Sequence, residues 1–279
     1  MTDRSVLYLT PVRLSNGARD GPMDNQAVGT GHYENFPVAS WLCPPELRGA
    51  IRSIYAFART ADDIADEGDA PPDDRLAQLG RFRRALADAT SNSSATPVCE
   101  WPQVFAALGH QIRQRDLPID QLHALLDAFE QDSRNPRYAT RDQLLDYCSR
   151  SANPIGRLLL HLYGIHDDDA LRASDAICSA LQLINFWQDL SVDLPRGRVY
   201  LPEADCRQFG VSARQLAAPA HDAAARALVA DLARWAAQLM ARGALLPLRV
   251  PGRAGWELRA VMHGGWRILE KIAAMQFRT

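Results

Sequence analysis

The sequence predicts an all-α protein, and three observations lead to that prediction. Apolar residues recur at steps of three, four and seven through most of the chain, as they do on amphipathic helices. No segment of useful length alternates apolar and polar residues, as a half-buried strand would. The 279 residues can bury a sizeable core, and they contain no internal repeat of fixed period. We therefore expect one helical domain over residues 31–279, after a flexible N-terminal arm over residues 1–30.

Composition argues against several classes of protein. The net charge of −2 gives no basic excess, so nucleic acid is not an expected partner. Five scattered cysteines, an odd number without CxxC spacing, favour reduced thiols in the cytoplasm over disulfides or a zinc site. No apolar run reaches the roughly 18 residues of a membrane-spanning helix, and the N-terminus lacks the pattern of a signal peptide. We expect a cytoplasmic protein, and peripheral contact with a membrane through an apolar patch stays open.

Breaks rich in proline, glycine and serine divide the first half of the chain into helices. Pro45 suits the first turn of a helix that ends at Asp66, before Gly68. Asp73 is the expected N-cap of the next helix, and the Ser- and Thr-rich residues 90–96 are expected to form a loop. Further helices are expected over residues 102–116, from residue 119 to a break at 134–136, and from residue 140 onward.

In the second half of the chain, the pattern predicts three long helices and two short ones. A break at residues 153–156 precedes a helix over 158–163, and a long helix follows over 170–190. Pro195 and Gly197 mark a turn after that long helix. The remaining helices are expected over residues 212–218, 222–244 and 254–276, which brings the total to about ten.

Two carboxylates lie on the apolar stripe of the helix predicted to end at Asp66. The stripe is formed by Ile51, Ile54, Tyr55, Ala58 and Ala65. Asp62 follows Ala58 by four residues and Asp66 follows Asp62 by four, so both side chains continue the stripe. Carboxylates on a buried face are costly, and two of them one turn apart repel each other. A divalent cation would offset both costs.

The same DxxxD spacing recurs at Asp189 and Asp193 near the end of the predicted long helix, on a stripe with Cys178, Gln182 and Asn185. Two facing helices with such pairs could hold Mg²⁺, which takes carboxylate oxygens together with water and substrate phosphates. This arrangement suits the ionisation of an allylic diphosphate, to which arginines add bidentate contacts. A solvated acidic face explains a single motif better than a metal site does, but two copies on core-facing stripes favour the metal site. The chain has no Glu-x-x-His pair, which argues against a di-iron bundle.

Both acidic stretches resemble the signatures of the squalene/phytoene synthase family. The first signature is residues 55–66, YAFARTADDIAD, and the second is residues 182–193, QLINFWQDLSVD, followed by RGRVYLP at 196–202. The likeness runs from about His32 to the last helix. It implies the class I isoprenoid synthase fold, in which helices surround a central apolar cavity with Mg²⁺ at its rim.

The resemblance also implies roles for individual residues. Asp62, Asp66, Asp189 and Asp193 would ligate Mg²⁺. Arg59 would hold diphosphate, and Arg198 and Tyr200 would cap the substrate. The remaining candidates would contact substrate, phosphate, water or a carbocation: Gln182, Asn185, Tyr55, His32, Asn35 and Phe36.

Plainer explanations stay open for several of these residues. Arg59 could form an ion pair with Asp62 or Asp63 within its own helix. Asp193 could be an ordinary helix-end residue, and Arg198 and Tyr200 could belong to a surface loop. Gln182 and Asn185 could be hydrogen-bonded core amides, and the neighbouring Phe57 is more readily explained by core packing than by contact with a cation.

Two further stretches, ENFPVAS at 34–40 and RSANPIG at 150–156, resemble one branch of the family, which acts in bacterial hopanoid biosynthesis. Gln188, Asn153 and Asn35 depart from the general family pattern, which puts the ordinary condensation of two prenyl diphosphates in doubt. The resemblance implies that presqualene diphosphate is ionised and rearranged, and that water quenches the cation to give hydroxysqualene. The alternatives are a squalene or presqualene diphosphate synthase acting on farnesyl diphosphate, a non-catalytic helical scaffold, and a partner subunit that contacts other squalene-pathway enzymes.

Overall fold

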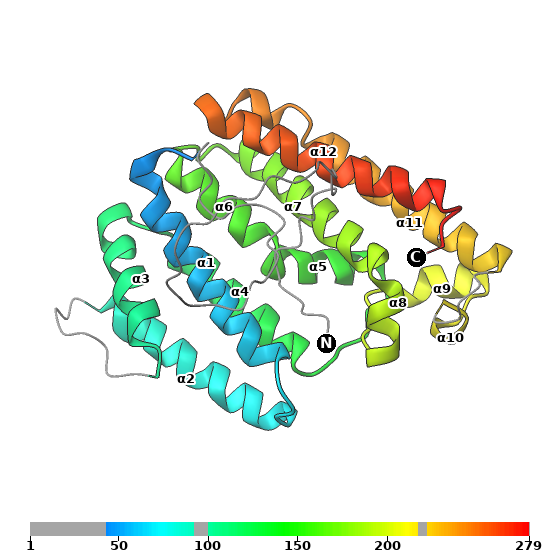
Figure 1. Cartoon of the computed structure of the whole chain (residues 1–279), viewed down its shortest axis with the longest axis horizontal. Helices are drawn as coiled ribbons and strands as arrows, with labels where there is room; N and C mark the ends of the chain where they lie inside the picture. Colours follow the sequence, from blue (N-terminus) through cyan, green and yellow to red (C-terminus); the bar gives the residue numbers. More distant parts are fainter. Residues whose placement is uncertain (1–42, 92–99, 217–221, 279) are drawn as a thin grey trace, which may run out of the picture.

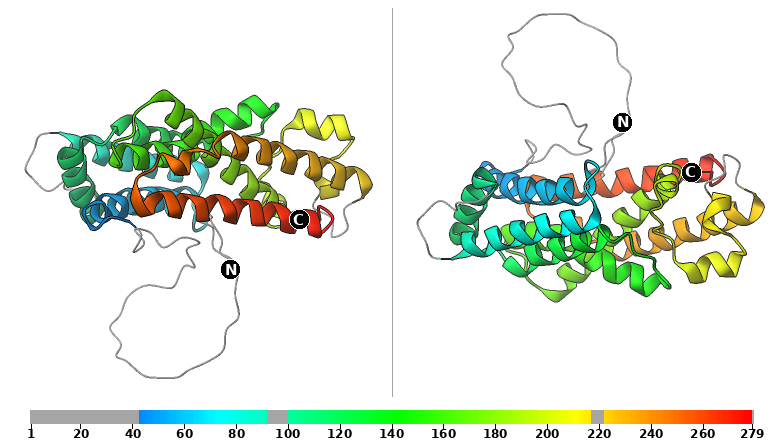
Figure 2. Two further views of the ribbon diagram at one scale, coloured as in Figure 1. Left: turned by 90° about the horizontal axis from the view of Figure 1, so that it is seen from above. Right: turned by 90° about the horizontal axis from the view of Figure 1, so that it is seen from below.

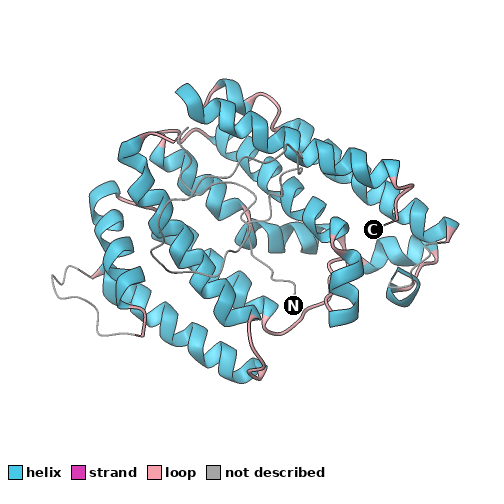
Figure 3. Ribbon diagram, viewed as in Figure 1, coloured by secondary structure: helices cyan, strands magenta, loops and turns pink. Residues whose placement is uncertain are grey.

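The computed structural model describes residues 43–91, 100–216 and 222–278. Every regular element in these ranges is a helix, so the all-α prediction is confirmed (Figures 1 and 3). The predicted N-terminal arm and residues 32–42 lie outside the described ranges. The helices are α1 (Pro45–Asp66), α2 (Pro72–Thr90), α3 (Pro102–Arg115), α4 (Ile119–Asp132), α5 (Arg141–Ser151), α6 (Asn153–Leu162), α7 (Asp168–Gln188), α8 (Leu190–Asp193), η1 (Leu194–Arg196), α9 (Glu203–Phe209), α10 (Ala213–Leu216), α11 (Ala223–Arg242), η2 (Leu246–Leu248) and α12 (Gly252–Ala274).

Two hydrophobic clusters form the core. Helices α1 to α4 build the first cluster around the rings of Phe57, Phe82 and Phe105. Helices α5, α7, α11 and α12 build the second cluster, which contains the buried ring of Trp187. Helices α4 and α6 contribute to both clusters and so join them. Along the long axis of the molecule, α2 and α3 lie at one end and α9 and α10 at the other (Figure 2).

Several helix boundaries differ from the prediction. Helix α2 begins at Pro72, so Asp73 lies in its first turn and is not its N-cap. Helix α7 ends at Gln188, two residues early, because Asp189 adopts φ −102° and ψ 17° and interrupts the helical ladder. The short helix α9 was not predicted. A break before the 158–163 segment is present, but it lies at Ala152: α5 ends at Ser151 and α6 begins at Asn153, so the residues 153–156 predicted to form the break are helical.

A close contact joins α11 to α7. Gly243 follows the last residue of α11 and lies against Ile177 and the backbone of Ala173. A Cβ atom built on Gly243 would lie 2.7 Å from the Ala173 carbonyl oxygen and would overlap the Ile177 side chain. Only glycine lets the two helices approach this closely. None of the described helices is long and apolar enough to cross a membrane.

Candidate active site

The last turns of α1 present the first acidic pair. Asp62 is only 6% exposed, as the apolar stripe predicts. Arg59 lies beside it, with Nη1 3.5 Å from Asp62 Oδ2, Nη2 2.7 Å from Asp63 Oδ1 and Nη2 2.9 Å from Glu67 Oε1. Asp63 is half-exposed. The ion pairs that were the plainer explanation for Arg59 are therefore present, and they hold this guanidinium beside Asp62.

The second acidic pair spans the junction of α7 and α8. Asp189 closes α7, and Asp193, which is 4% exposed, ends α8. The Asp193 backbone N–H donates to the Asp189 carbonyl at 2.9 Å, so the two residues stay one turn apart although α7 ends at Gln188, just before them. The Asp193 carbonyl in turn accepts from the Arg198 backbone N–H at 3.1 Å. This bond brings the turn formed by residues 196–198, the RGR turn, back beside α8.

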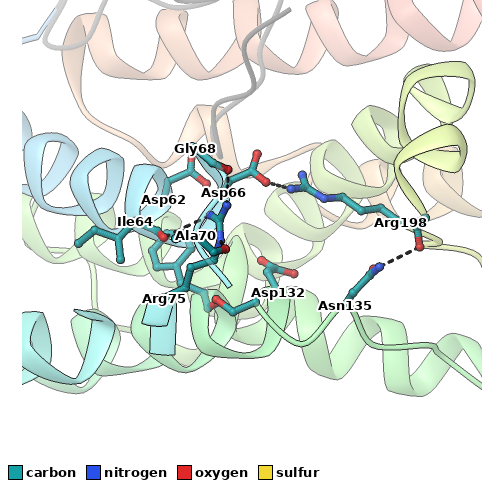
Figure 4. A network of polar contacts seen from close by, with 12 residues as sticks. Asp62, Ile64, Asp66, Gly68, Ala70, Arg75, Asp132, Asn135 and Arg198 are labelled. Carbon is teal, nitrogen blue, oxygen red and sulfur yellow. Dashed lines mark hydrogen bonds and ion pairs between the residues drawn. The ribbon is translucent and has the colours of Figure 1, made fainter. Parts of the chain in front are cut away.

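The RGR turn connects the two signatures. Arg198 forms an ion pair with Asp66 at the end of α1. Asn135, after α4, donates its Nδ2 to the Gly197 carbonyl at 3.0 Å and fixes the turn from the other side (Figure 4). Arg75 of α2 donates to the carbonyls of Gly68 and Ala70 and braces the loop after α1. Segments far apart in the sequence thus bring carboxylates and guanidinium groups to one place.

The donor set fits a divalent cation whose coordination is completed by ligand oxygens. In the described part of the chain, no three Asp, Glu, His or Cys side chains lie close enough to form a metal site by themselves. Asp62 and Asp66 are hard oxygen donors one turn apart, and Mg²⁺ usually takes one or two carboxylates with water and substrate phosphate. The arginines that now touch the acids, Arg59 and Arg198, suit diphosphate oxygens.

A stack of aromatic rings lies beside the RGR turn. The Tyr200 ring is stacked on Phe186 of α7, with centroids 3.9 Å apart and planes 3° apart. Tyr147 of α5 lies 5.8 Å from Tyr200 and 5.5 Å from Tyr138. Tyr200 therefore belongs to an ordered cluster and not to a free surface loop. Aromatic faces of this kind can stabilise a positive charge on carbon.

The aromatic stack holds a carboxyl group that the sequence did not single out. Asp132, at the end of α4, accepts a hydrogen bond from the Tyr147 hydroxyl at 2.8 Å and from the Tyr200 hydroxyl at 3.3 Å. Burial of the carboxyl raises the pKa of Asp132 to about 7, although the two hydroxyls and the Arg150 charge act in the opposite direction. Asp132 and Tyr147 carry no spacing pattern, because their partners come from other segments.

The other candidates occupy mixed environments. Phe57 packs against Phe82 and Phe105 with ring centroids 5.2 and 6.2 Å apart, so core packing explains it. Asn185 is buried, whereas Gln182 and Tyr55 are partly buried. His32, Asn35 and Phe36 lie outside the described residues.

Two of the unusual family positions are visible in the structure. Asn153 Oδ1 accepts from Ser179 Oγ at 2.9 Å and ties α6 to α7. The Gln188 side-chain oxygen is buried and has no hydrogen-bond partner among the described residues. Asn153 thus has a clear packing role. The Gln188 side-chain oxygen, next to Asp189 in the sequence, could still accept a hydrogen bond.

Known proteins match both the sequence and the fold. The squalene/phytoene synthase family model matches residues 30–279. A hydroxysqualene synthase from Zymomonas mobilis subsp. mobilis is 38% identical over 219 residues, which cover 77% of this chain and 68% of that protein. A presqualene diphosphate synthase from Rhodopseudomonas palustris is 29% identical over 256 residues, 92% of this chain and 88% of that protein.

A solved structure is similar to this chain in both fold and sequence. The crystal structure of squalene synthase HpnC from Alicyclobacillus acidocaldarius superimposes with a TM-score of 0.80 and 37% identity, covering 88% of this chain and 90% of that one. The fold is that of the isoprenoid synthases, as the sequence predicts. The chain belongs to the squalene/phytoene synthase family.

Proposed function

We propose that this protein is a hydroxysqualene synthase. It would convert presqualene diphosphate and water into hydroxysqualene and diphosphate. The observation that carries the proposal is the ion pair between Asp66 of the first signature and Arg198 beside the second, because it joins both signatures in one polar site. The similarity to a relative named hydroxysqualene synthase, at 38% identity, supports this choice within the family.

In this proposal, Asp62, Asp66, Asp189 and Asp193 hold Mg²⁺. The bound ion would neutralise charge on the leaving diphosphate. Arg59 and Arg198 exchange their carboxylate partners for diphosphate oxygens and orient the leaving group.

The remaining residues of the site are proposed to contact the hydrocarbon part of the substrate. Tyr200 and Phe186 offer a stacked aromatic surface to the cation that remains after the diphosphate has left. Tyr55 of α1 and Gln182 and Asn185 of α7 are proposed to contact the substrate. His32, Asn35 and Phe36 are proposed substrate contacts on sequence grounds alone.

The choice of substrate can be tested directly. Purified protein is incubated with Mg²⁺ and either presqualene diphosphate or farnesyl diphosphate, and the products are identified by mass spectrometry. We expect hydroxysqualene from presqualene diphosphate and no product from farnesyl diphosphate alone. Product from farnesyl diphosphate, with none from presqualene diphosphate, would replace the proposal by the runner-up, a presqualene diphosphate or squalene synthase. Activity with neither substrate would favour a scaffold or partner subunit.

We also propose that the protein contacts a lipid surface through an apolar patch. The patch consists of Leu245, Leu248 and Trp256, which are 71%, 66% and 64% exposed. Gly255 lies against the carbonyls of Pro247 and Val250, so η2 and the first turn of α12 are held together. The Arg259 guanidinium lies 4.7 Å above the Trp256 ring. Arg242, Arg249 and Arg253, which are close to the patch in sequence, are exposed, and Arg249 pairs with Asp167 at 2.7 Å. Apolar side chains among arginines suit a membrane with anionic headgroups.

The lipid contact predicts a specific loss on substitution. The double variant Leu248→Ser, Trp256→Ser should co-sediment with phosphatidylglycerol vesicles several-fold less than the parent, because burial of these side chains in the lipid interface is lost. Met275→Ser is the matched control, since Met275 is 58% exposed at the far end of α12. Equal binding of the double variant and the parent, or no binding by the parent, would contradict the proposal.

A further inference from the structure

We propose that Asp132 accepts, through the hydroxyl of Tyr147, the proton that is released when water attacks the cation. The inference rests on the proposed function, because water attack is the step that distinguishes hydroxysqualene formation. Asp132 does not need to touch the substrate: it receives the proton through a tyrosine, and we therefore describe it as a positioning residue.

The geometry of the hydrogen bonds supports a relay. Asp132 Oδ2 accepts from the Tyr147 hydroxyl at 2.8 Å, and Oδ1 accepts from the Tyr200 hydroxyl at 3.3 Å. The three residues come from the end of α4, from α5 and from the segment after the RGR turn. Both hydroxyls therefore direct their protons toward one carboxyl group. A proton given to the Tyr147 oxygen can pass on as the original phenol proton moves to Asp132.

The relay is part of the aromatic stack, and Tyr200 links it to the RGR turn of the leaving-group site. Tyr200 supplies one of the two hydroxyl groups that bind Asp132. It follows Arg198 by two residues, and Arg198 forms the ion pair with Asp66. Figure 4 shows Asp132 in the same close-up as Asp66, Arg198 and Asn135, with no contact marked between Asp132 and these three residues. The rings of Tyr147 and Tyr200 also pack with Phe186, at centroid distances of 6.1 and 3.9 Å. A cation held against these rings would lie near the hydroxyls that end the relay.

The environment makes the carboxyl, and not a phenolate, the final acceptor. Burial, with the neighbouring Asp132 charge second, raises the pKa of Tyr147 well above its ordinary value, so this phenol stays neutral. Burial raises the pKa of Asp132 to about 7, so near neutral pH the group can both accept and release a proton. The other groups facing Asp132 are Tyr138 and Arg150, and Arg150 is itself bound to Gln131 and Asp146.

The proposed step balances in atoms and charge. The water oxygen forms a bond to the cationic carbon, and one water O–H bond breaks. That proton moves to the Tyr147 oxygen while the Tyr147 proton moves to Asp132 Oδ2. The products are the neutral alcohol, a neutral Tyr147 and a protonated Asp132, which later returns its proton to solvent.

The test measures how the cation partitions between products. Presqualene diphosphate and Mg²⁺ are given to the parent and to Asp132→Asn, and both diphosphate release and the ratio of hydroxysqualene to other hydrocarbon products are recorded. We expect the variant to release diphosphate but to lower this ratio at least about tenfold, since the acceptor for the water proton is lost. The ratio is independent of how fast the cation forms, so a slower ionisation step would not change it.

The pH profile provides a second readout. Asp132 is protonated below its pKa of about 7 and cannot accept, and it is ionised above that pH. The hydroxysqualene ratio of the parent should therefore rise as the pH passes upward through about 7, and the ratio of Asp132→Asn should not. Tyr147→Phe keeps the ring and removes the relay hydroxyl, and it should give the same low, flat ratio.

Asp205→Asn is the matched control. Asp205 is a buried carboxylate in α9, bound to Arg141 at 2.8 Å, and its variant should keep the parent ratio and pH profile. An unchanged ratio in both Asp132→Asn and Tyr147→Phe would overturn the relay. A parent that forms no hydroxysqualene would instead refute the proposed function, and this inference with it.

Discussion

Replacing Asp62 by asparagine is expected to slow diphosphate release from presqualene diphosphate by at least about 100-fold. Asp62 is the buried member of the first acidic pair, and the amide removes the negative charge that the proposed metal requires. The measurement is the rate of diphosphate release at saturating substrate over a range of Mg²⁺ concentrations. Asp189→Asn should show a loss of the same order, because it belongs to the second pair.

Asp63→Asn is the control for this prediction. Asp63 lies next to Asp62 on the same helix, but it is half-exposed and pairs with Arg59 at 2.7 Å. Its variant should keep activity within a few-fold of the parent. Thermal melting of all variants separates a loss of the metal site from a loss of the fold. Full activity in both Asp62→Asn and Asp189→Asn would show that these two carboxylates are not needed for ionisation of the substrate.

The second large effect concerns stability. Gly243→Ala should lower the free energy of unfolding by about 2 kcal/mol, because the new methyl group overlaps Ile177 and the Ala173 backbone. The expected observation is a lower midpoint in urea denaturation with an unchanged slope. The mutation leaves the polar site untouched, so the specific activity of the folded protein should remain that of the parent.

Gly80→Ala is the matched control for the stability effect. Gly80 lies inside α2, and a Cβ there would meet only Arg84 Nη1, at 3.8 Å. This substitution should stabilise the protein by about 0.5–1 kcal/mol, because alanine loses less conformational freedom in a helix. If Gly243→Ala were as stable as the parent, α7 and α11 would have to separate without cost.

Structural features that depend on residues close together in the chain could be predicted from the sequence. The burial of Asp62 follows from its spacing to Ala58, and most helices follow from apolar periodicity. The predicted start of α2 is wrong by two residues, since Pro72 opens the helix and Pro71, not Asp73, is its N-cap. Asp189 interrupts α7 through a backbone conformation that no periodicity encodes.

Contacts between distant segments could not be predicted in the same way. The pairing of Asp66 with Arg198 needs the fold to bring the end of α1 to the RGR turn. Asp132 is a single acid before a proline-containing break, and only the structure shows the two tyrosine hydroxyls around it. Asn153 was expected to influence substrate choice, but its visible partner is Ser179, so its effect on substrate would act through the packing of α6 and α7.

The contacts of Arg59 and Arg198 with the first acidic pair have a consequence for ligand binding. These arginines act as counter-ions supplied by the protein itself, so the charges of Asp62 and Asp66 are already partly compensated, although Arg59 is shared with Asp63 and Glu67. A divalent cation arriving alone would have to compete with both guanidinium groups. A cation arriving with diphosphate offers the arginines new anionic partners at the same moment. Metal and substrate should therefore bind with positive coupling, each weakly without the other.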